Sequence, residues 1–183
     1  MDIAAEDDAP ILLLEDDVEF TPELFMRASD IESFVISGRT EAYNLGCIPF
    51  FTLPTMGKHV RCMLSGMAQA VIYTRAARLK MRHLHIQWVH DLELSKRLVT
   101  HIPSRPCAVQ KMMPTSNSNG WGKQSIVDPR PYFYMFGSKT DGQPLMEYHH
   151  ALARVGGCGF VYTVVVILIT TAILKKVHHK LYA

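Results

Sequence analysis

The sequence lacks several features that would assign the chain to a class of protein. Its four cysteines form no Cys-x-x-Cys pair, so neither a zinc site nor a redox pair is indicated. No asparagine begins an Asn-x-Ser/Thr sequon, so the sequence gives no sign of lumenal glycosylation. No run of Lys and Arg with interleaved aromatic residues is present, so no nucleic-acid partner is expected. Residues 1–20 have no basic segment and no long apolar segment, and they therefore do not form a signal peptide.

Basic residues are absent from the start of the chain. Residues 1–23 contain nine of the 17 acids and no Lys or Arg, whereas the other eight acids face all 19 basic residues. The net charge of residues 24–183 is therefore +11. A basic body suits a polyanionic ligand such as a nucleotide diphosphate, or an anionic membrane surface. An ordinary basic protein surface has the same charge, so charge alone does not choose between these alternatives.

An apolar run that ends in acids is the most informative feature that is present. Ile11 to Leu14 are followed at once by Glu15, Asp16 and Asp17. A short apolar run predicts a strand buried on both faces of a parallel sheet, and such sheets bind ligands at the carboxyl ends of their strands. Because strand side chains alternate, Glu15 and Asp17 are expected on one side, where two carboxylates can hold a hard divalent cation. Acids that merely end a strand at the surface are the simpler alternative.

Alternating strand and helix patterns predict the α/β class for the folded part of the chain. Thr21 and Pro22 fit the N-cap and the first position of a helix, and Phe20 with Phe25 fits a hydrophobic staple. The predicted strands cover residues 11–14, 33–37, 69–73 and 107–109, and the predicted helices cover residues 22–29, 75–82 and 91–99. Loops are expected at Gly38, Gly46 and Pro49.

The chain also changes composition along its length. We expect an acidic, disordered lead over residues 1–9, a folded domain over 10–136, a linker over 137–154, a transmembrane helix over 155–174 and a basic tail over 175–183. The uncharged stretch has the length that a bilayer core requires, although a buried core helix is an alternative. Lysines after it favour a cytoplasmic C-terminus. That orientation conflicts with the missing signal peptide unless a further N-terminal segment exists, which we expect. The predicted location is a membrane of the endoplasmic reticulum or Golgi, crossed once.

Three segments, taken in order, resemble the family 25 glycosyltransferases, which include lipooligosaccharide and collagen galactosyltransferases. The acidic strand end, LLLEDDVEF, is similar to that family's acidic motif. Tyr43 to Gly46 resembles its Leu-Gly after a second strand, and Ser65 to Ala77 resembles its small-residue strand that leads into a helix. The likeness covers roughly residues 10–122 and implies a partial GT-A-like nucleotide-sugar transferase domain without its N-terminal half.

The resemblance implies an inverting, metal-dependent transfer of a sugar, such as galactose, from a nucleotide-sugar to a hydroxyl group. The donor would be a UDP-sugar and the acceptor a glycan or a protein. Carried over by position, Glu15 and Asp17 would hold Mn²⁺ or Mg²⁺, and Asp16, Gly46 and Gly66 would lie beside the donor. A divalent ion neutralises a diphosphate leaving group as a Lewis acid.

Inversion also needs a general base for the acceptor hydroxyl. Asp91 is the candidate that the resemblance implies, although its place at the start of a predicted helix equally suits an N-cap. Two other functions compete with the transferase. A catalytically inactive, membrane-anchored remnant could act as a binding or adaptor protein. A metal-dependent phosphoryl hydrolase could use the same acids, but no nucleophile or second metal cluster is evident in the sequence.

Overall fold

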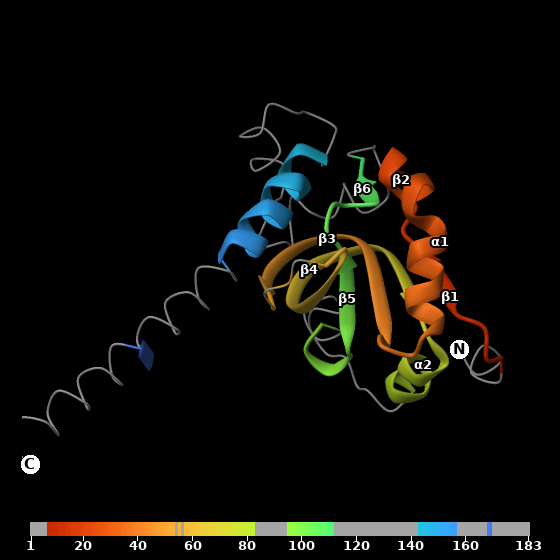
Figure 1. The fold of residues 1–183 in the computed structure, drawn as a ribbon. Helices are drawn as coiled ribbons and strands as arrows, with labels where there is room; N and C mark the ends of the chain where they lie inside the picture. Colours follow the sequence, from red (N-terminus) through yellow and green to blue (C-terminus); the bar gives the residue numbers. More distant parts are fainter. Residues whose placement is uncertain are drawn as a thin grey trace, which may run out of the picture.

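A computed structural model describes residues 7–53, 55, 57–82, 95–111, 143–156 and 168–169. Its centre is a strongly curved sheet with the long helix α1 packed on one face, and a further helix lies at the opposite side of the sheet (Figure 1). The elements in chain order are β1 (Ile11–Leu14), β2 (Val18–Phe20), α1 (Pro22–Ile36), β3 (Ala42–Thr52), β4 (His59–Tyr73), α2 (Arg75–Met81), β5 (Thr100–Pro103) and β6 (Ala108–Gln110), followed by a helix over residues 143–156.

The main sheet has the strand order β1-β4-β3-β5, and β2 pairs with β6 in a separate two-stranded sheet. Strand β4 runs antiparallel to β1, β3 and β5, and only β3 and β5 are parallel. The prediction of a doubly covered parallel sheet is therefore wrong. Strands β3 and β4 are consecutive in the chain and pair directly, and a direct antiparallel connection needs no crossover helix.

Two predicted loop positions lie inside β3. Gly46 pairs with Ala70, and Pro49 pairs with Ser65. The pairing of β3 with β4 shifts register at several points along this stretch. Proline has no N–H for a sheet ladder and is tolerated at such irregularities, so Pro49 bends the strand without ending it.

Helix α1 runs through the segment predicted as a strand over residues 33–37. Ile31, Phe34 and Val35 recur at helical spacing and pack with Tyr43 and Leu45 in the largest core cluster. Burial of that face explains why the β-branched residues here are helical, because tertiary packing overrides weak local propensity.

The start of α1 is fixed differently from the expectation. Pro22 is at the first helical position, as predicted. Thr21 is the N-cap residue, but its side chain makes no cap hydrogen bond and instead donates to the carbonyl of Pro106 at 2.9 Å. Phe25 is 75 % exposed, so the predicted hydrophobic staple does not form.

Strand β1 lies at the edge of the sheet, and its burial also differs from the expectation. Leu12, Leu13 and Leu14 are 44 %, 49 % and 44 % exposed. The apolar run therefore does not belong to a strand that is buried on both faces. Its strand character is confirmed, with Ile11 opposite Tyr73 and Leu14 opposite Ala70 in β4.

The C-terminal part brings the second correction to the fold class. Residues 143–156 form a helix that covers most of the predicted linker and the first two residues of the predicted span, and His150 of this helix contacts the carbonyl of Cys47 at 3.2 Å. Within the parts of the chain that the structure describes, no helix is long and apolar enough to span a membrane. Most of the predicted span, residues 157–167 and 170–174, lies outside those parts. The predicted class, a partial GT-A-like α/β domain with one C-terminal transmembrane helix, is thus not the class observed.

Candidate functional site

The three consecutive acids lie where β1 ends and the chain turns into β2. Leu14 is the last residue of β1, and the Glu15 amide donates to the carbonyl of Gln69 in β4 at 2.8 Å. Asp16 and Asp17 form the turn, and both Glu15 and Asp16 are exposed. Because the chain turns at once, the strand alternation used to pair Glu15 with Asp17 does not extend over the acids.

Asp17 is the acid that the fold holds in place. Its side chain is half-buried, and its Oδ2 atom accepts a hydrogen bond from Gln110 Nε2 at 2.7 Å. The Asp17 backbone carbonyl accepts from the Lys111 amide at 2.8 Å. Gln110 is the last residue of β6 and is only 4 % exposed. The carboxylate of Asp17 is thus fixed against a buried carboxamide.

Two oxygen atoms of this pair are buried and have no hydrogen-bond partner among the described residues. They are Asp17 Oδ1 and Gln110 Oε1. The fully buried Gln69, whose carbonyl binds the Glu15 amide, also has both side-chain polar atoms without a partner in that part of the chain. A buried oxygen without a partner costs roughly 1–3 kcal/mol, and more when it is charged. The pair therefore presents two acceptor oxygens that a cation, a water molecule or another hydrogen-bond donor can satisfy.

Strand β6 is held beneath the turn by an unusually close contact with β3. The Cys107 amide donates to the Leu45 carbonyl at 2.8 Å, and the Thr21 amide donates to the Cys107 carbonyl at 3.0 Å. A Cβ atom added to Gly46 would lie 2.3 Å from the carbonyl oxygen of Ala108. Only glycine permits this approach, which sets the position of Gln110 two residues later.

The groups around the turn define which ligand chemistry is available. Glu19 on β2 pairs with Lys111 through Oε2 and Nζ at 3.0 Å. Burial raises the pKa of the Cys107 thiol to about 12, so this sulfur is protonated near pH 7. The available donors near Asp17 are therefore oxygen atoms, which suit Mg²⁺ or Mn²⁺.

The predicted site residues do not all come together. Gly46 serves the contact between β3 and β6, whereas Gly66 pairs with Ile48 and faces the ring of Phe50. Asp91 lies outside the described residues. No group of three His, Cys, Asp or Glu side chains that could hold a metal occurs in the described ranges. A cation at Asp17 would therefore complete its coordination with water or with ligand oxygens, as Mg²⁺ commonly does.

Sequence reasoning missed Gln69 and Gln110 as members of this site. Neither residue has a charge or a motif that would mark it, and only the fold brings both next to the acidic turn. The one available signal was that Gln110 directly follows the short strand predicted over residues 107–109.

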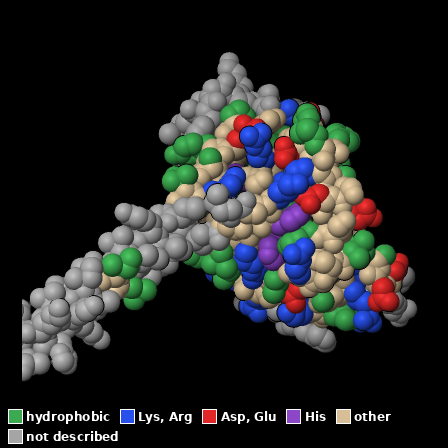
Figure 2. All heavy atoms as spheres, viewed as in Figure 1, with side chains coloured by type: hydrophobic (Ala, Val, Ile, Leu, Met, Phe, Trp, Pro, Cys, Tyr) green, Lys and Arg blue, Asp and Glu red, His purple; other side chains and the backbone are tan. Residues whose placement is uncertain are grey.

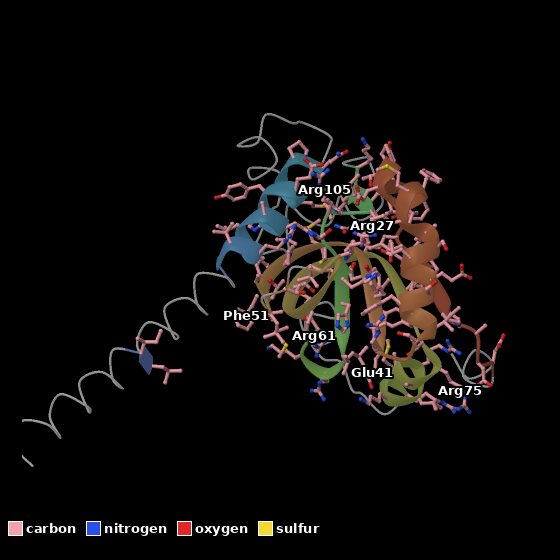
Figure 3. All side chains as sticks on the ribbon, viewed as in Figure 1. Arg27, Glu41, Phe51, Arg61, Arg75 and Arg105 are labelled. Atoms are coloured by element: carbon pink, nitrogen blue, oxygen red, sulfur yellow. The ribbon has the colours of Figure 1, made fainter. Side chains whose placement is uncertain are left out.

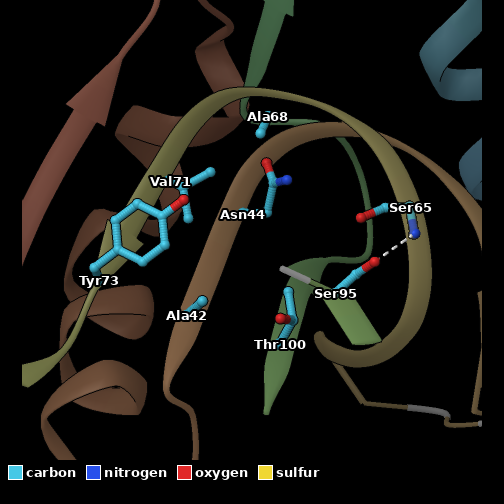
Figure 4. Close-up of a pocket in the computed structure, with 8 residues that line it drawn as sticks. All are labelled: Ala42, Asn44, Ser65, Ala68, Val71, Tyr73, Ser95 and Thr100. Atoms are coloured by element: carbon cyan, nitrogen blue, oxygen red, sulfur yellow. Dashed lines mark hydrogen bonds between the residues drawn. The ribbon is translucent and has the colours of Figure 1, made fainter. Parts of the chain in front are cut away.

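Two cavities lie away from the acidic turn. The smaller, of about 10 Å³, lies between β3, β4 and β5, with Ser95 Oγ accepting from the Ser65 amide at 3.2 Å (Figure 4). It has room for one water molecule at most. The larger, of about 340 Å³, is an apolar groove between α1 and the β1–β4 edge, with Leu12, Ile31 and Ile72 in its lining. Glu32 is its one charged lining residue.

Comparison with known proteins identifies no relative: no family model, no curated protein and no solved structure matches the chain. The glycosyltransferase resemblance therefore stays a prediction, and the functional argument depends on the chemistry of the acidic turn.

Proposed function

We propose that the chain provides the cation-binding part of a glycosyltransferase. In this proposal Asp17 binds Mn²⁺ or Mg²⁺, and the ion binds the diphosphate of a nucleotide-sugar such as a UDP-sugar. The sugar is transferred to a hydroxyl group of a glycan or a protein. The observation that carries the proposal is the pair of buried, unpartnered oxygen atoms, Asp17 Oδ1 and Gln110 Oε1.

The donor set supports a hard divalent ion. A carboxylate and an amide carbonyl are both oxygen ligands of the kind that Mg²⁺ and Mn²⁺ accept. The hydrogen bond from Gln110 Nε2 to Asp17 Oδ2 orients the carboxylate, and outer-shell bonds of this kind commonly change metal affinity by about 10–100-fold. Glu15 and Asp16 are exposed at the same turn and add negative charge around the site.

The chemistry of sugar transfer gives each group a role. A bound cation supplies Lewis-acid stabilisation of a departing diphosphate. In this proposal Asp17 and Gln110 hold the cation in position, and the exposed Glu15 and Asp16 face solvent beside it. We keep Asp91 as the proposed general base for the acceptor hydroxyl. The proposed contacts to the nucleotide-sugar donor are Asp16, Gly46 and Gly66. The close approach of Ala108 already requires glycine at position 46 for structural reasons.

Calorimetric titration of the full chain with Mn²⁺ tests the cation site. We expect one saturable site, and we expect Asp17→Ala to abolish it because the carboxylate that Gln110 orients is removed. Glu19→Gln is the matched control, because Glu19 lies two residues away and pairs with Lys111. Equal Mn²⁺ binding by the parent protein and by Asp17→Ala would refute the proposal.

A second measurement separates cation binding from sugar transfer. UDP-galactose is titrated with and without Mn²⁺, and release of UDP is then followed in the presence of acceptor glycans. Binding of the donor that requires both Mn²⁺ and Asp17 supports the proposed function. If Mn²⁺ binds but UDP-galactose does not, the cation site is supported and the proposed sugar transfer is refuted.

A non-catalytic binding function is the second candidate, and the edge strand β1 favours it. An edge strand presents unpaired backbone groups that can pair with a further strand. Here the edge carries three half-exposed leucines beside the apolar groove of about 340 Å³. Asp7 and Asp8 precede the strand and Glu15 and Asp16 follow it, all of them exposed. The fitting occupant is an extended apolar peptide with basic residues at both ends.

Fluorescence anisotropy with such a peptide tests this candidate. We expect Leu12→Lys to abolish binding, because Leu12 lines the groove and a lysine on an edge strand blocks strand addition. Met26→Lys is the control, because Met26 is 73 % exposed on α1 and does not line the groove. Binding that is equally weakened by both variants, or that is absent in the parent protein, would reject the candidate.

A further inference from the structure

A second group of polar side chains gathers on the α1 face of the sheet, around the ring of Phe34. The ring of His59 in β4 stacks on Phe34 with a centroid distance of 4.0 Å. The ring of His101 in β5 meets it edge-on at 5.0 Å, and the guanidinium carbon of Arg39 lies 4.6 Å from its centroid. We call Arg39, Arg61, His59 and His101 the basic cluster.

Arg61 joins the cluster through the sheet register. It lies opposite His101 in the antiparallel β4–β5 pair, so both side chains share one face. Its guanidinium group lies beside β5 (Figure 3), where it donates to the carbonyl of Thr100 at 2.7 Å and to the carbonyls of Leu98 and Cys62 at 3.4 Å. Arg61 therefore contributes mainly its charge to the cluster. On the same side of the molecule, histidine side chains lie between groups of Lys and Arg side chains (Figure 2).

The acids near the cluster are already engaged. Asp30 Oδ2 lies 3.4 Å from His59 Nε2 and 3.4 Å from Arg27 NH2. Glu41 pairs with Lys80 and accepts from the Val99 amide at 2.8 Å, although it also attracts Arg61 at longer range. In the described ranges, neither Arg39 nor Arg61 has a carboxylate within ion-pair distance.

His101 experiences the resulting positive field. Its pKa is lowered to about 4, first by burial and then by the charges of Arg61, His59 and Arg39. It is therefore neutral near pH 7 and can donate one N–H. Its Nδ1 atom is buried and has no hydrogen-bond partner among the described residues.

We propose that the basic cluster binds a phosphate-type oxyanion, carried either by a small phosphorylated molecule or by a lipid headgroup. Two guanidinium groups and an imidazole N–H are donors that match a tetrahedral oxyanion, and charge-assisted bonds to arginine are the strong ones. Stacking on Phe34 and the hydrogen bond from Arg39 Nε to Ser37 Oγ at 3.1 Å restrain the guanidinium group of Arg39 before a ligand binds. An anion would also relieve the repulsion between like charges.

This site is separate from the acidic turn. His59 and Arg61 lie at the start of β4, whereas Gln69, which contacts the turn, lies near its end. The two sites also differ in charge and in ligand, since the turn offers oxygen donors to a cation. The test can therefore be made with EDTA present, so that no divalent ion at Asp17 contributes to phosphate binding.

The test is an NMR titration of the full chain with inorganic phosphate at pH 7, followed through the histidine ring signals. We expect saturable shifts of the His59 and His101 signals with a dissociation constant in the millimolar range, about 4 kcal/mol of binding free energy. We also expect the His101 pKa to rise when phosphate is bound, because a nearby anion favours the protonated ring. No saturable shift at His101 up to roughly 50 mM phosphate would overturn the proposal.

Matched arginine variants test whether the basic cluster is responsible for phosphate binding. Arg39→Gln should weaken phosphate binding about tenfold or more, and Arg39→Lys should weaken it less because the charge remains. Arg75→Gln on α2 is the control, because Arg75 is also exposed but pairs with Asp8. If Arg75→Gln weakens phosphate binding as much as Arg39→Gln, phosphate binding depends on the overall positive charge of the protein, and the proposed site is wrong.

Vesicles identify the source of the oxyanion. Phosphatidylcholine vesicles with and without phosphatidic acid are compared for the parent protein and for Arg39→Gln. Binding that requires phosphatidic acid and is weakened by Arg39→Gln assigns the site to a lipid headgroup. Phosphate binding without such a vesicle effect assigns it to a small phosphorylated molecule. If Arg39→Gln changes neither phosphate binding nor vesicle binding, the cluster is not an oxyanion site.

Discussion

The contact between Gly46 and Ala108 gives the sharpest prediction, because it links stability to the proposed cation site. An added Cβ at Gly46 would lie 2.3 Å from the Ala108 carbonyl oxygen and 2.8 Å from its carbonyl carbon. Ordinary van der Waals contact begins at 3.4 Å, so Gly46→Ala must push β3 and β6 apart by about 1 Å. Both partners are backbone, and no rotamer change can relieve the clash.

The expected cost follows from measured effects of overpacking, which are typically about 1–3 kcal/mol. For a chain of this size the melting temperature falls by about 2–4 °C per kcal/mol, so Gly46→Ala should melt roughly 2–12 °C lower. The shift of β6 also displaces Gln110, which orients Asp17. We therefore expect Mn²⁺ affinity to fall about tenfold, as for loss of an outer-shell bond.

Differential scanning fluorimetry measures the first effect and calorimetric titration measures the second. Gly66→Ala is the matched control, since its added Cβ would meet only the ring of Phe50 at 3.1 Å. Phe50 is 53 % exposed and can rotate away. If Gly46→Ala and Gly66→Ala have the same melting temperature, the close approach of β3 and β6 is not what positions Gln110, and the reasoning fails.

Three further predictions test other parts of the fold. Gly38 has φ +75° with nothing within 4 Å, so Gly38→Ala should lower the free energy of unfolding by about 1 kcal/mol through backbone strain alone, measured by urea denaturation. Tyr43→Phe removes the 2.9 Å hydrogen bond to His59 Nδ1 and should cost about 1 kcal/mol in the same assay; an unchanged midpoint would contradict it. Burial lowers the pKa of His150 to about 4, so stability is complete above the ordinary value near 6.5 and is lost as the pH falls towards 4. The loss should reach about 2 kcal/mol at pH 5, and His150→Gln should reduce this pH dependence.

Local patterns in the sequence predicted the elements whose signals lie within a few residues. The strand at residues 11–14 and the helix that starts at Pro22 are confirmed, and so is the helix after Thr74, whose side chain accepts from the Ala77 amide at 3.4 Å. Capping chemistry and the fixed φ of proline act locally, so they can be interpreted without knowledge of the fold.

Burial and pairing could not be predicted in the same way. The leucines of β1 were expected inside the protein because a continuous apolar run does not say which side of a strand is covered. The segment 33–37 is predicted as a strand from its own residues. Its helical state depends on packing against residues such as Tyr43 and Leu45, and only the fold shows that they are its partners. Tertiary packing determines both the exposure of these leucines and the helical state of residues 33–37. The local sequence of each segment gives no information about that packing.

The candidate sites show the same division between local and non-local information. The acidic turn could be found from sequence because its three acids are consecutive, yet the residue that orients Asp17 is 93 positions away. The basic cluster has no sequence signature at all, because Arg39 comes from the loop after α1 and Arg61 and His101 come from two different strands. Both sites depend on β4, which pairs with β1 next to the turn and with β5 next to the cluster. The strand has the oxygen-rich turn near one end and the arginine-containing face near the other, so the proposed cation and the proposed anion would not compete for the same groups.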